Sequence, residues 1–157
     1  MDAEGCGVRI YTDGSCIPNP GYGGNAFVVV RNDALQYKEF SESQGLTTNN
    51  EQELLAIIGA MKWIIASSLD GDTHTIFTDS KYCQNGINTW MGKWKENGWK
   101  TANNKPVANI NLWKLIDNLL GCIKNKSMEL RFEWVKGHSN DKWNDFVDKL
   151  AKNAYNI

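Results

Sequence analysis

The segment that decides the fold is residues 8–13, with the sequence VRIYTD. Its side chains alternate between two sides, as those of a β-strand do. The strand is expected to end at Asp13, because glycine follows. Val8, Ile10 and Thr12 lie on one side of this strand, and Arg9, Tyr11 and Asp13 lie on the other.

Two more strands are expected next along the chain. A stretch rich in turn residues, from Asn19 to Gly24, leads to the β-branched run Ala26–Arg31. The third strand, Tyr37–Ser43, is more polar and is expected at a sheet edge. Because short links join these three strands, they should be antiparallel.

Helices are expected after the third strand. Thr48 and Glu51 have the spacing of a capping box, in which each side chain satisfies a free backbone donor of the other residue. Apolar residues then recur at helical spacing up to Ile65. The later elements are expected to be a strand at Thr75–Asp79, short helical pieces at Tyr82–Ile87 and Trp90–Glu96, a loop at Gly98–Asn109, a helix at Leu112–Ile123, a strand at Met128–Val135, a loop at Lys136–Asn140 and a helix at Asp141–Ala154.

This order of elements predicts a layered α/β fold. A strand reached through a crossover helix should be parallel to its predecessor. We therefore expect a five-stranded mixed β-sheet, in which the first three strands are antiparallel, the last two are parallel to the first, and helices flank the sheet. With 157 residues, the chain is expected to form a single domain over residues 1–157.

Composition excludes several classes of protein. Lys and Arg number 17 against 18 Asp and Glu, so a surface that is basic throughout is not expected. The apolar runs are too short to span a bilayer, and Met1–Arg9 lacks the pattern of a signal peptide. The four cysteines are scattered and form no CxxC pair. We expect a soluble, cytoplasmic monomer with reduced thiols and no membrane association.

Four acidic residues carry the strongest functional signal. Taken singly, Asp13 could form a turn, Asp79 could cap a helix, and Glu53 and Asp148 could be solvated. Asp13 and Asp79, however, end strands that should be neighbours, and Glu53 lies in the first turns of a helix packed on that sheet. Clustered carboxylates are tolerated mainly when a cation neutralises them, and oxygen ligands select Mg²⁺, for which Mn²⁺ can substitute.

Many segments together resemble type-1 ribonuclease H in order and spacing, over essentially the whole chain. The shared segments are Tyr11–Cys16, Asn19-Pro20-Gly21, Gly23-Gly24, Thr47–Asn50, Glu53-Leu54, Thr78-Asp79-Ser80, Gly98–Thr101, Trp134–His138, Asn144 and Asp148–Ala151. The resemblance implies an RNase H-like fold and an endoribonuclease. Its substrate would be the RNA strand of an RNA/DNA hybrid, and its products would carry 5′-phosphate and 3′-hydroxyl ends.

The resemblance also implies roles for particular residues in the reaction. Asp13, Glu53, Asp79 and Asp148 would hold two Mg²⁺ ions. Two ions about 4 Å apart could hold the scissile phosphate, lower the pKa of the attacking water and stabilise the departing 3′ oxygen. His138, in the loop before the last helix, would assist proton transfer or product release.

The same resemblance implies which residues hold the hybrid. A hybrid differs from DNA by its 2′-hydroxyls, so a reader of its minor groove needs small hydrogen-bonding groups at close approach. Cys16, Asn19, Asn49 and Asn50 match residues along that groove. Tyr82 and Trp90 would line a channel for the DNA strand, while Thr48 and Asn109 would bind a DNA phosphate.

Two departures from the family pattern bear on affinity. Trp90 and Trp94 with their interleaved lysines are expected to form an exposed, phosphate-facing ridge on the family's projecting handle. Glu96 and Asn97 stand where the bacterial handle is usually basic, and Leu46 stands where many relatives have Arg. We therefore expect weaker hybrid binding than in a relative with a basic handle.

Three other functions fit parts of this pattern. A catalytically inactive hybrid-binding domain of the same fold is disfavoured because all four acids and His138 are present. A DNA-directed nuclease of the same fold would share the acids but would normally lack the Asn-rich loops and the handle. An interaction module without a nucleic-acid role would leave the acids unexplained.

Overall fold

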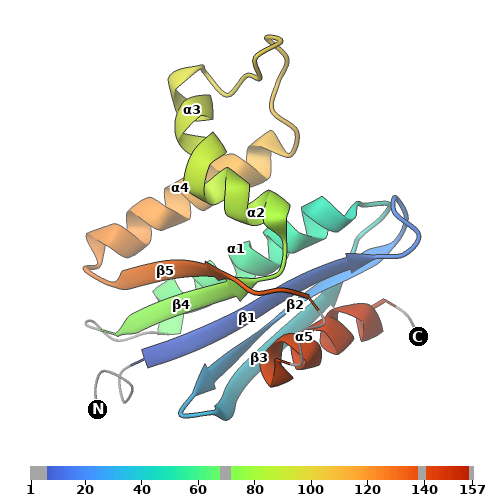
Figure 1. Cartoon of the computed structure of the whole chain (residues 1–157), viewed down its shortest axis with the longest axis vertical. Coiled ribbons are helices and arrows are strands. Elements are labelled where there is room, and N and C mark those ends of the chain that lie inside the picture. The colour runs from blue at the N-terminus through green and yellow to red at the C-terminus, as the bar shows by residue number, and fades with distance from the viewer. Residues whose placement is uncertain (1–6, 68–71, 138–140, 156–157) are drawn as a thin grey trace.

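A computed structural model describes residues 7–67, 72–137 and 141–155. Its strands form one mixed sheet in the order β3-β2-β1-β4-β5, with helices on both faces (Figure 1). Strands β1, β2 and β3 are antiparallel neighbours, whereas β4 is parallel to β1 and β5 is parallel to β4, which confirms the predicted sheet. The strands are β1 (Gly7–Cys16), β2 (Gly23–Arg31), β3 (Ala34–Glu42), β4 (Thr73–Thr78) and β5 (Glu129–Trp134).

The helices differ from the predicted ones mainly between residues 81 and 96. The two short pieces predicted there form one continuous run, because Gly86 keeps right-handed helical φ and ψ and a π-helical turn, Gly86–Trp90, joins the two. No break therefore separates them. The helices are α1 (Asn49–Ser67), α2 (Lys81–Asn85), α3 (Met91–Glu96), α4 (Ile110–Asn125) and α5 (Lys142–Asn153).

Strand β1 is longer than its sequence suggested. The Asp13-Gly14 pair predicts an end, but pairing with β2 continues through Gly14↔Asn25 to Cys16↔Gly23. The two glycines of β2 carry no side chains that would hinder this close pairing. Asp13 therefore lies within a strand and is not a turn residue.

The capping box predicted at the start of α1 forms only in part. Thr48 Oγ1 accepts a hydrogen bond from the Glu51 backbone N–H at 3.1 Å, as predicted. The Glu51 carboxylate accepts a hydrogen bond from the Thr47 hydroxyl. Glu51 thus anchors the loop that precedes the helix.

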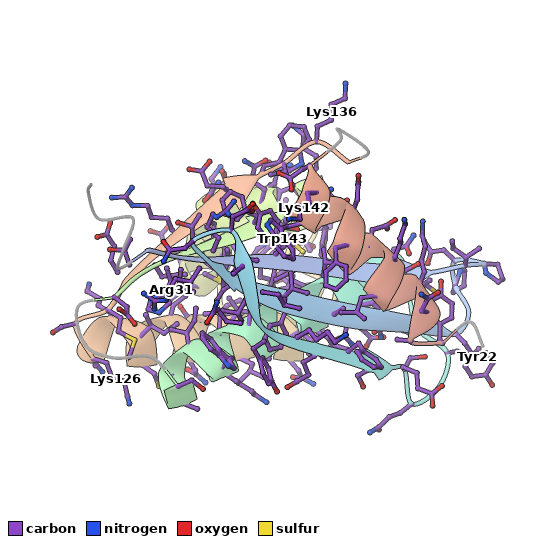
Figure 2. All side chains as sticks on the ribbon, turned by 90° about the horizontal axis from the view of Figure 1, so that it is seen from below. Tyr22, Arg31, Lys126, Lys136, Lys142 and Trp143 are labelled. Carbon is purple, nitrogen blue, oxygen red and sulfur yellow. The ribbon has the colours of Figure 1, made fainter. Side chains whose placement is uncertain are left out.

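Helices cover both faces of the sheet. Helices α1 and α4 pack on the face that carries Ile10 and Phe27. Helix α5 packs on the opposite face, against Tyr11 and Val28, with Trp143 buried beneath it (Figure 2). The alternation within residues 8–13 therefore separates two cores. Strand β3, in contrast, is exposed along its whole length at the edge, as predicted.

The handle comprises α2, the π-helical turn, α3 and the loop up to Asn109, and it projects away from the sheet (Figure 1). Its base is the fully buried indole of Trp113 on α4. Trp113 Nε1 donates a hydrogen bond to the Tyr82 hydroxyl at 3.1 Å. A Cβ on Gly86 would lie 2.0 Å from the Trp113 ring, so only glycine lets the handle seat so closely.

No helix among residues 7–67, 72–137 and 141–155 is long and apolar enough to cross a membrane.

Gly86→Ala should destabilise the protein because its methyl group must displace the buried Trp113 ring. Overpacking of this kind costs about 1–3 kcal/mol of unfolding free energy, which urea denaturation followed by tryptophan fluorescence would measure. Gly92→Ala is the matched control, since among the described residues no atom beyond its chain neighbours and its own helix backbone lies within 4 Å of the added Cβ. The control should be neutral or slightly stabilising, because alanine is the better helix former. Equal effects of the two changes would contradict this account of the handle.

Candidate active site

Three carboxylates from distant parts of the chain converge beside the interior strands β1 and β4. Asp13 lies on β1, Glu53 on α1 and Asp79 directly after β4, and one oxygen from each lies within 4.8 Å of the others. Strands β1 and β4 are parallel neighbours paired up to Tyr11↔Phe77. Asp13 and Asp79 each follow that pair by two residues, so the register brings them together.

A glycine allows α1 to approach β1 at this point. The Gly14 backbone N–H donates to Glu53 Oε1 at 2.9 Å and to Asp13 Oδ1 at 3.0 Å. A Cβ on Gly14 would lie 2.3 Å from backbone atoms of both Gln52 and Glu53. Any side chain there would push the helix away, so the position of Glu53 depends on the absence of one.

The backbone of Asp79 is held by a residue of strand β5. Trp134 Nε1 donates to the Asp79 backbone carbonyl at 3.2 Å. Ser80, and not Asp79, caps helix α2, because its Oγ accepts from the Cys83 N–H at 3.1 Å.

Asp148 lies beside the three clustered acids on α5. It is close enough to help raise the pKa of Asp13, and its Oδ2 accepts from Lys152 Nζ at 3.1 Å. Lys152 was not among the predicted site residues, although its spacing of four residues from Asp148 on a helix is the signal that could have indicated it. The predicted group of four acids is thus a tight set of three with a fourth alongside.

Burial and mutual repulsion disfavour the charged forms of this cluster. Desolvation, followed by the charges of Glu53 and Asp79, raises the pKa of Asp13 well above its usual range. Desolvation and then Asp79 raise the pKa of Glu53, while the Gly14 N–H partly offsets the rise. Three oxygen donors of this kind fit a hard divalent cation such as Mg²⁺ or Mn²⁺, whose charge would relieve the repulsion.

Three of the four residues predicted to face the minor groove are linked by hydrogen bonds. Asn49 Oδ1 accepts from the Cys16 backbone N–H at 2.7 Å, and the Asn49 N–H donates to Asn19 Oδ1 at 3.2 Å. The Cys16 side chain is buried, with its thiol directed at the Pro18 carbonyl. Asn50, the other predicted groove residue, is exposed at the start of α1. His138 lies outside the described residues.

Three of the four predicted DNA-side residues, Tyr82, Trp90 and Asn109, also meet. Asn109 Nδ2 donates to the Tyr82 hydroxyl at 3.2 Å, and the rings of Tyr82 and Trp90 lie 5.9 Å apart edge to face. The prediction of an exposed tryptophan ridge is wrong in one respect, since Trp90 and Trp94 are half-buried. Trp94 packs on Trp113 with ring centroids 5.3 Å apart, and Trp90 packs on Trp94 at 5.8 Å, so each indole is partly covered by the next. The lysines at positions 93, 95 and 100 are exposed.

The raised pKa values of the two most buried acids predict how stability depends on pH in the absence of metal. At pH values between the unfolded and the folded pKa of such a carboxyl group, the folded protein binds more protons than the unfolded chain. The free energy of unfolding therefore falls as pH rises from the unfolded pKa to the folded pKa. Asp13→Asn removes one such charge. In EDTA, the free energy of unfolding of the variant should exceed that of wild type by an amount that grows with pH to about 1–3 kcal/mol, the cost of a buried unpaired group. Urea denaturation at each pH measures this difference.

Asp33→Asn is a control for which the stability difference from wild type should depend on pH in the opposite direction. A hydrogen bond from Trp143, followed by the charge of Lys142, lowers the pKa of exposed Asp33. Its charge therefore stabilises the fold above its unfolded pKa, and this stabilisation is lost as pH falls through the lower folded value. A pH-independent difference between Asp13→Asn and wild type would contradict the electrostatic description of the cluster.

Comparison with known proteins identifies the family. The family model described as RNase H matches residues 6–156. The ribonuclease H of Ruthia magnifica is 46% identical over 151 residues, covering 94% of this chain and 94% of that protein. The ribonuclease H of Pseudoalteromonas atlantica is 43% identical over 147 residues, covering 94% and 89%.

A solved structure with similar backbone geometry agrees with these relatives. LC9-RNase H1, a type 1 RNase H with the type 2 active-site motif, superposes with a TM-score of 0.71 at 26% identity. The match covers 92% of this chain and 70% of that chain. With the family model matching nearly the whole sequence, and with the acids placed together on this fold, the chain belongs to the RNase H family.

Proposed function

We propose that this ribonuclease H cleaves the RNA strand of an RNA/DNA hybrid with two divalent cations, Mg²⁺ in the first place, held by Asp13, Glu53, Asp79 and Asp148. The single observation that carries the proposal is the approach of three carboxylates, from β1, from α1 and from the residue after β4, to within 4.8 Å. Such a cluster is electrostatically unfavourable unless cations occupy it. Bound there, the cations would activate the attacking water and stabilise the leaving 3′ oxygen.

The residues of the chain have separate tasks in this reaction. Asp13 and Glu53 share the Gly14 N–H, which fixes the orientation of their oxygens before any ligand binds. Lys152 neutralises part of the charge on Asp148. We propose that His138, which directly follows Gly137 in the sequence, assists proton transfer or product release.

Hydrogen bonding within the groove determines what its amides offer to the hybrid. The Oδ1 atoms of Asn19 and Asn49 each accept a backbone N–H. Their NH₂ groups are hydrogen-bond donors, and the minor-groove face of a hybrid presents acceptors at base edges and 2′-hydroxyls. We propose that these amides, exposed Asn50 and the backbone of Cys16 contact the groove.

We assign binding of the DNA strand mainly to residues of the handle. The Tyr82 hydroxyl accepts hydrogen bonds from Asn109 and Trp113 and retains its own proton as a donor. Tyr82 and half-buried Trp90 are proposed to line the DNA channel, with Thr48 and Asn109 at a phosphate. We further propose that the enzyme acts as a monomer in the cytoplasm.

Asp79→Asn should abolish cleavage. Loss of one carboxylate removes a metal ligand, so a labelled hybrid incubated with Mg²⁺ should be cut by wild type and remain intact with the variant, a loss of about 10²-fold or more. EDTA should stop the wild-type reaction. Asp72→Asn, at the opposite end of β4, is the matched control and should cleave normally.

Two outcomes would reject this assignment. Undiminished cleavage by the Asp79→Asn variant would mean that the acidic cluster is not the reaction site. Cleavage of a DNA duplex in place of the hybrid would favour the DNA-directed alternative.

An all-RNA duplex and a DNA with a single embedded ribonucleotide complete the substrate set, and we expect both to be spared.

Glu96→Lys should make hybrid binding tighter and more dependent on salt. Each additional phosphate contact steepens the slope of log K against log salt concentration by about 0.9, so a fluorescence-anisotropy titration at several salt concentrations measures the contact directly. Glu39→Lys, on the opposite edge strand β3, makes the same charge change away from the handle and should leave the slope unchanged. Equal slopes for all three proteins would show that residue 96 does not face the hybrid.

A further inference from the structure

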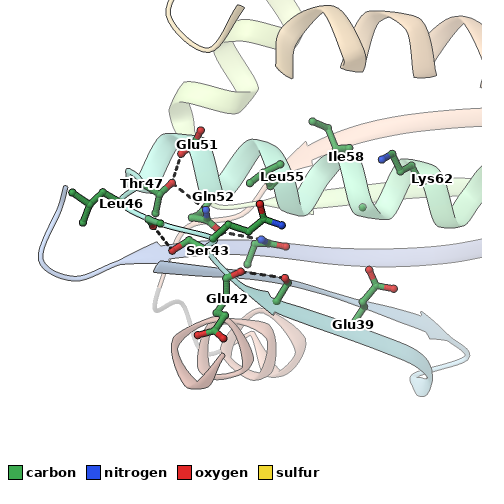
Figure 3. A pocket seen from close by; sticks show the side chains of 15 residues that line it. Glu39, Glu42, Ser43, Leu46, Thr47, Glu51, Gln52, Leu55, Ile58 and Lys62 are labelled. Atoms are coloured by element: carbon green, nitrogen blue, oxygen red, sulfur yellow. Dashed lines mark hydrogen bonds between the residues drawn. The ribbon is translucent and has the colours of Figure 1, made fainter. Parts of the chain in front are cut away.

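A buried amide lies behind the hybrid-contact end of helix α1. Gln52 is 1% exposed. Its Oε1 accepts a hydrogen bond from Asn25 Nδ2 on β2 at 2.9 Å, and its Nε2 donates to Thr47 Oγ1 at 3.0 Å. The Thr47 hydroxyl in turn donates to the Glu51 carboxylate. These four residues, which we call the Gln52 network, lie at one end of a groove of about 630 Å³ between β3 and α1 (Figure 3).

Thr47 connects this network to the loop that carries Asn19. The backbones of Thr47 and Gly21 exchange two hydrogen bonds, of 2.6 and 3.1 Å. The Thr47 carbonyl also accepts from Cys16 Sγ at 3.4 Å. The loop with Asn19 and the first turn of α1 are therefore joined at Thr47, and Gln52 supports Thr47 from the interior.

Gln52 also lies next to a proposed metal ligand. Consecutive residues on a helix point about 100° apart, so Gln52 and Glu53 tie α1 to different strands. Glu53 is bonded to Gly14 on β1, and Gln52 is bonded to Asn25 on β2. Two such ties fix both the rotation and the distance of the first turns of the helix, where Asn49 and Asn50 also lie.

We propose that Gln52 is a positioning residue for hybrid binding and for the metal site. Through Asn25 and Thr47 it holds the start of α1, so that the groove amides and Glu53 are in place before substrate binds. The proposal rests on the proposed function. It assigns Gln52 no contact with substrate, because its side chain is buried and both of its polar atoms have partners inside the protein.

Gln52→Met tests the proposal because methionine has a similar length but makes neither hydrogen bond. We expect KM for the hybrid to rise about tenfold, the effect of one or two lost hydrogen bonds, with kcat at saturating Mg²⁺ falling much less. The Mg²⁺ concentration for half-maximal rate should rise as well. Hydrogen exchange by mass spectrometry should become faster in residues 16–22 and 47–53.

Ile64→Val is the matched control. Ile64 is fully buried on the same helix, 12 residues or about 18 Å beyond Gln52. It should lower Tm without changing KM or the exchange of residues 16–22 and 47–53. A Gln52→Met variant that behaves in the same way, with lower Tm and unchanged KM, would show that the network only stabilises the fold and would overturn the proposal.

Two further measurements keep the test decisive. Asn25→Ala removes only the bond on β2 and replaces Gln52→Met if that variant does not fold; it should raise KM in the same direction. In the double variant the two effects should be less than additive, because both changes break one interaction. Hydrogen exchange needs no activity, so failure of wild type to cleave a hybrid would reject the proposed function alone. Unchanged exchange in Gln52→Met would reject the Gln52 network.

Discussion

The contact between strand β1 and helix α1 at Gly14 is the constraint on which the site depends. There is no space for a side chain at this position, and the backbone N–H binds the carboxylates of both Asp13 and Glu53. Separating these acids would relieve their repulsion. The chain cannot separate them, because the residues that follow Glu53 on α1, beginning with Leu54, are buried against the sheet and hold the helix in place.

The fold thus balances an unfavourable charge cluster against a buried core. Apolar burial stabilises by about 25 cal/mol per Å², and α1 supplies several fully buried side chains. The raised pKa of Asp13 and of Glu53 reflects what the cluster costs without a cation. Binding of a cation would convert this cost into affinity, which explains how a stable fold can retain a site that repels itself.

Around the acids, the groups assigned to the hybrid are organised before substrate binds. Hydrogen bonds link Asn49 to Cys16 and to Asn19, and Cys16 to Thr47. Tyr82 is bonded to Asn109 and Trp113 at the base of the handle. A binding surface that is ordered in advance loses less conformational entropy on association. The half-buried indoles of Trp90 and Trp94 pack within the handle and also form part of its surface.

The sequence alone determined the order of elements, the mixed sheet and the convergence of the acids. Alternation in residues 8–13, helical spacing after Thr48 and the crossover rule depend on local periodicity and chain connectivity, which are properties of the sequence. Only the tertiary structure decided where β1 ends, that Glu51 binds Thr47, that residues 81–96 form one helical run, that Lys152 binds Asp148, and that buried Gln52 binds Asn25 and Thr47. Each of these depends on which side chains and backbones meet across distant segments, and the glycines of β2, Thr47 and the indole of Trp113 exert their effects only after the chain has folded.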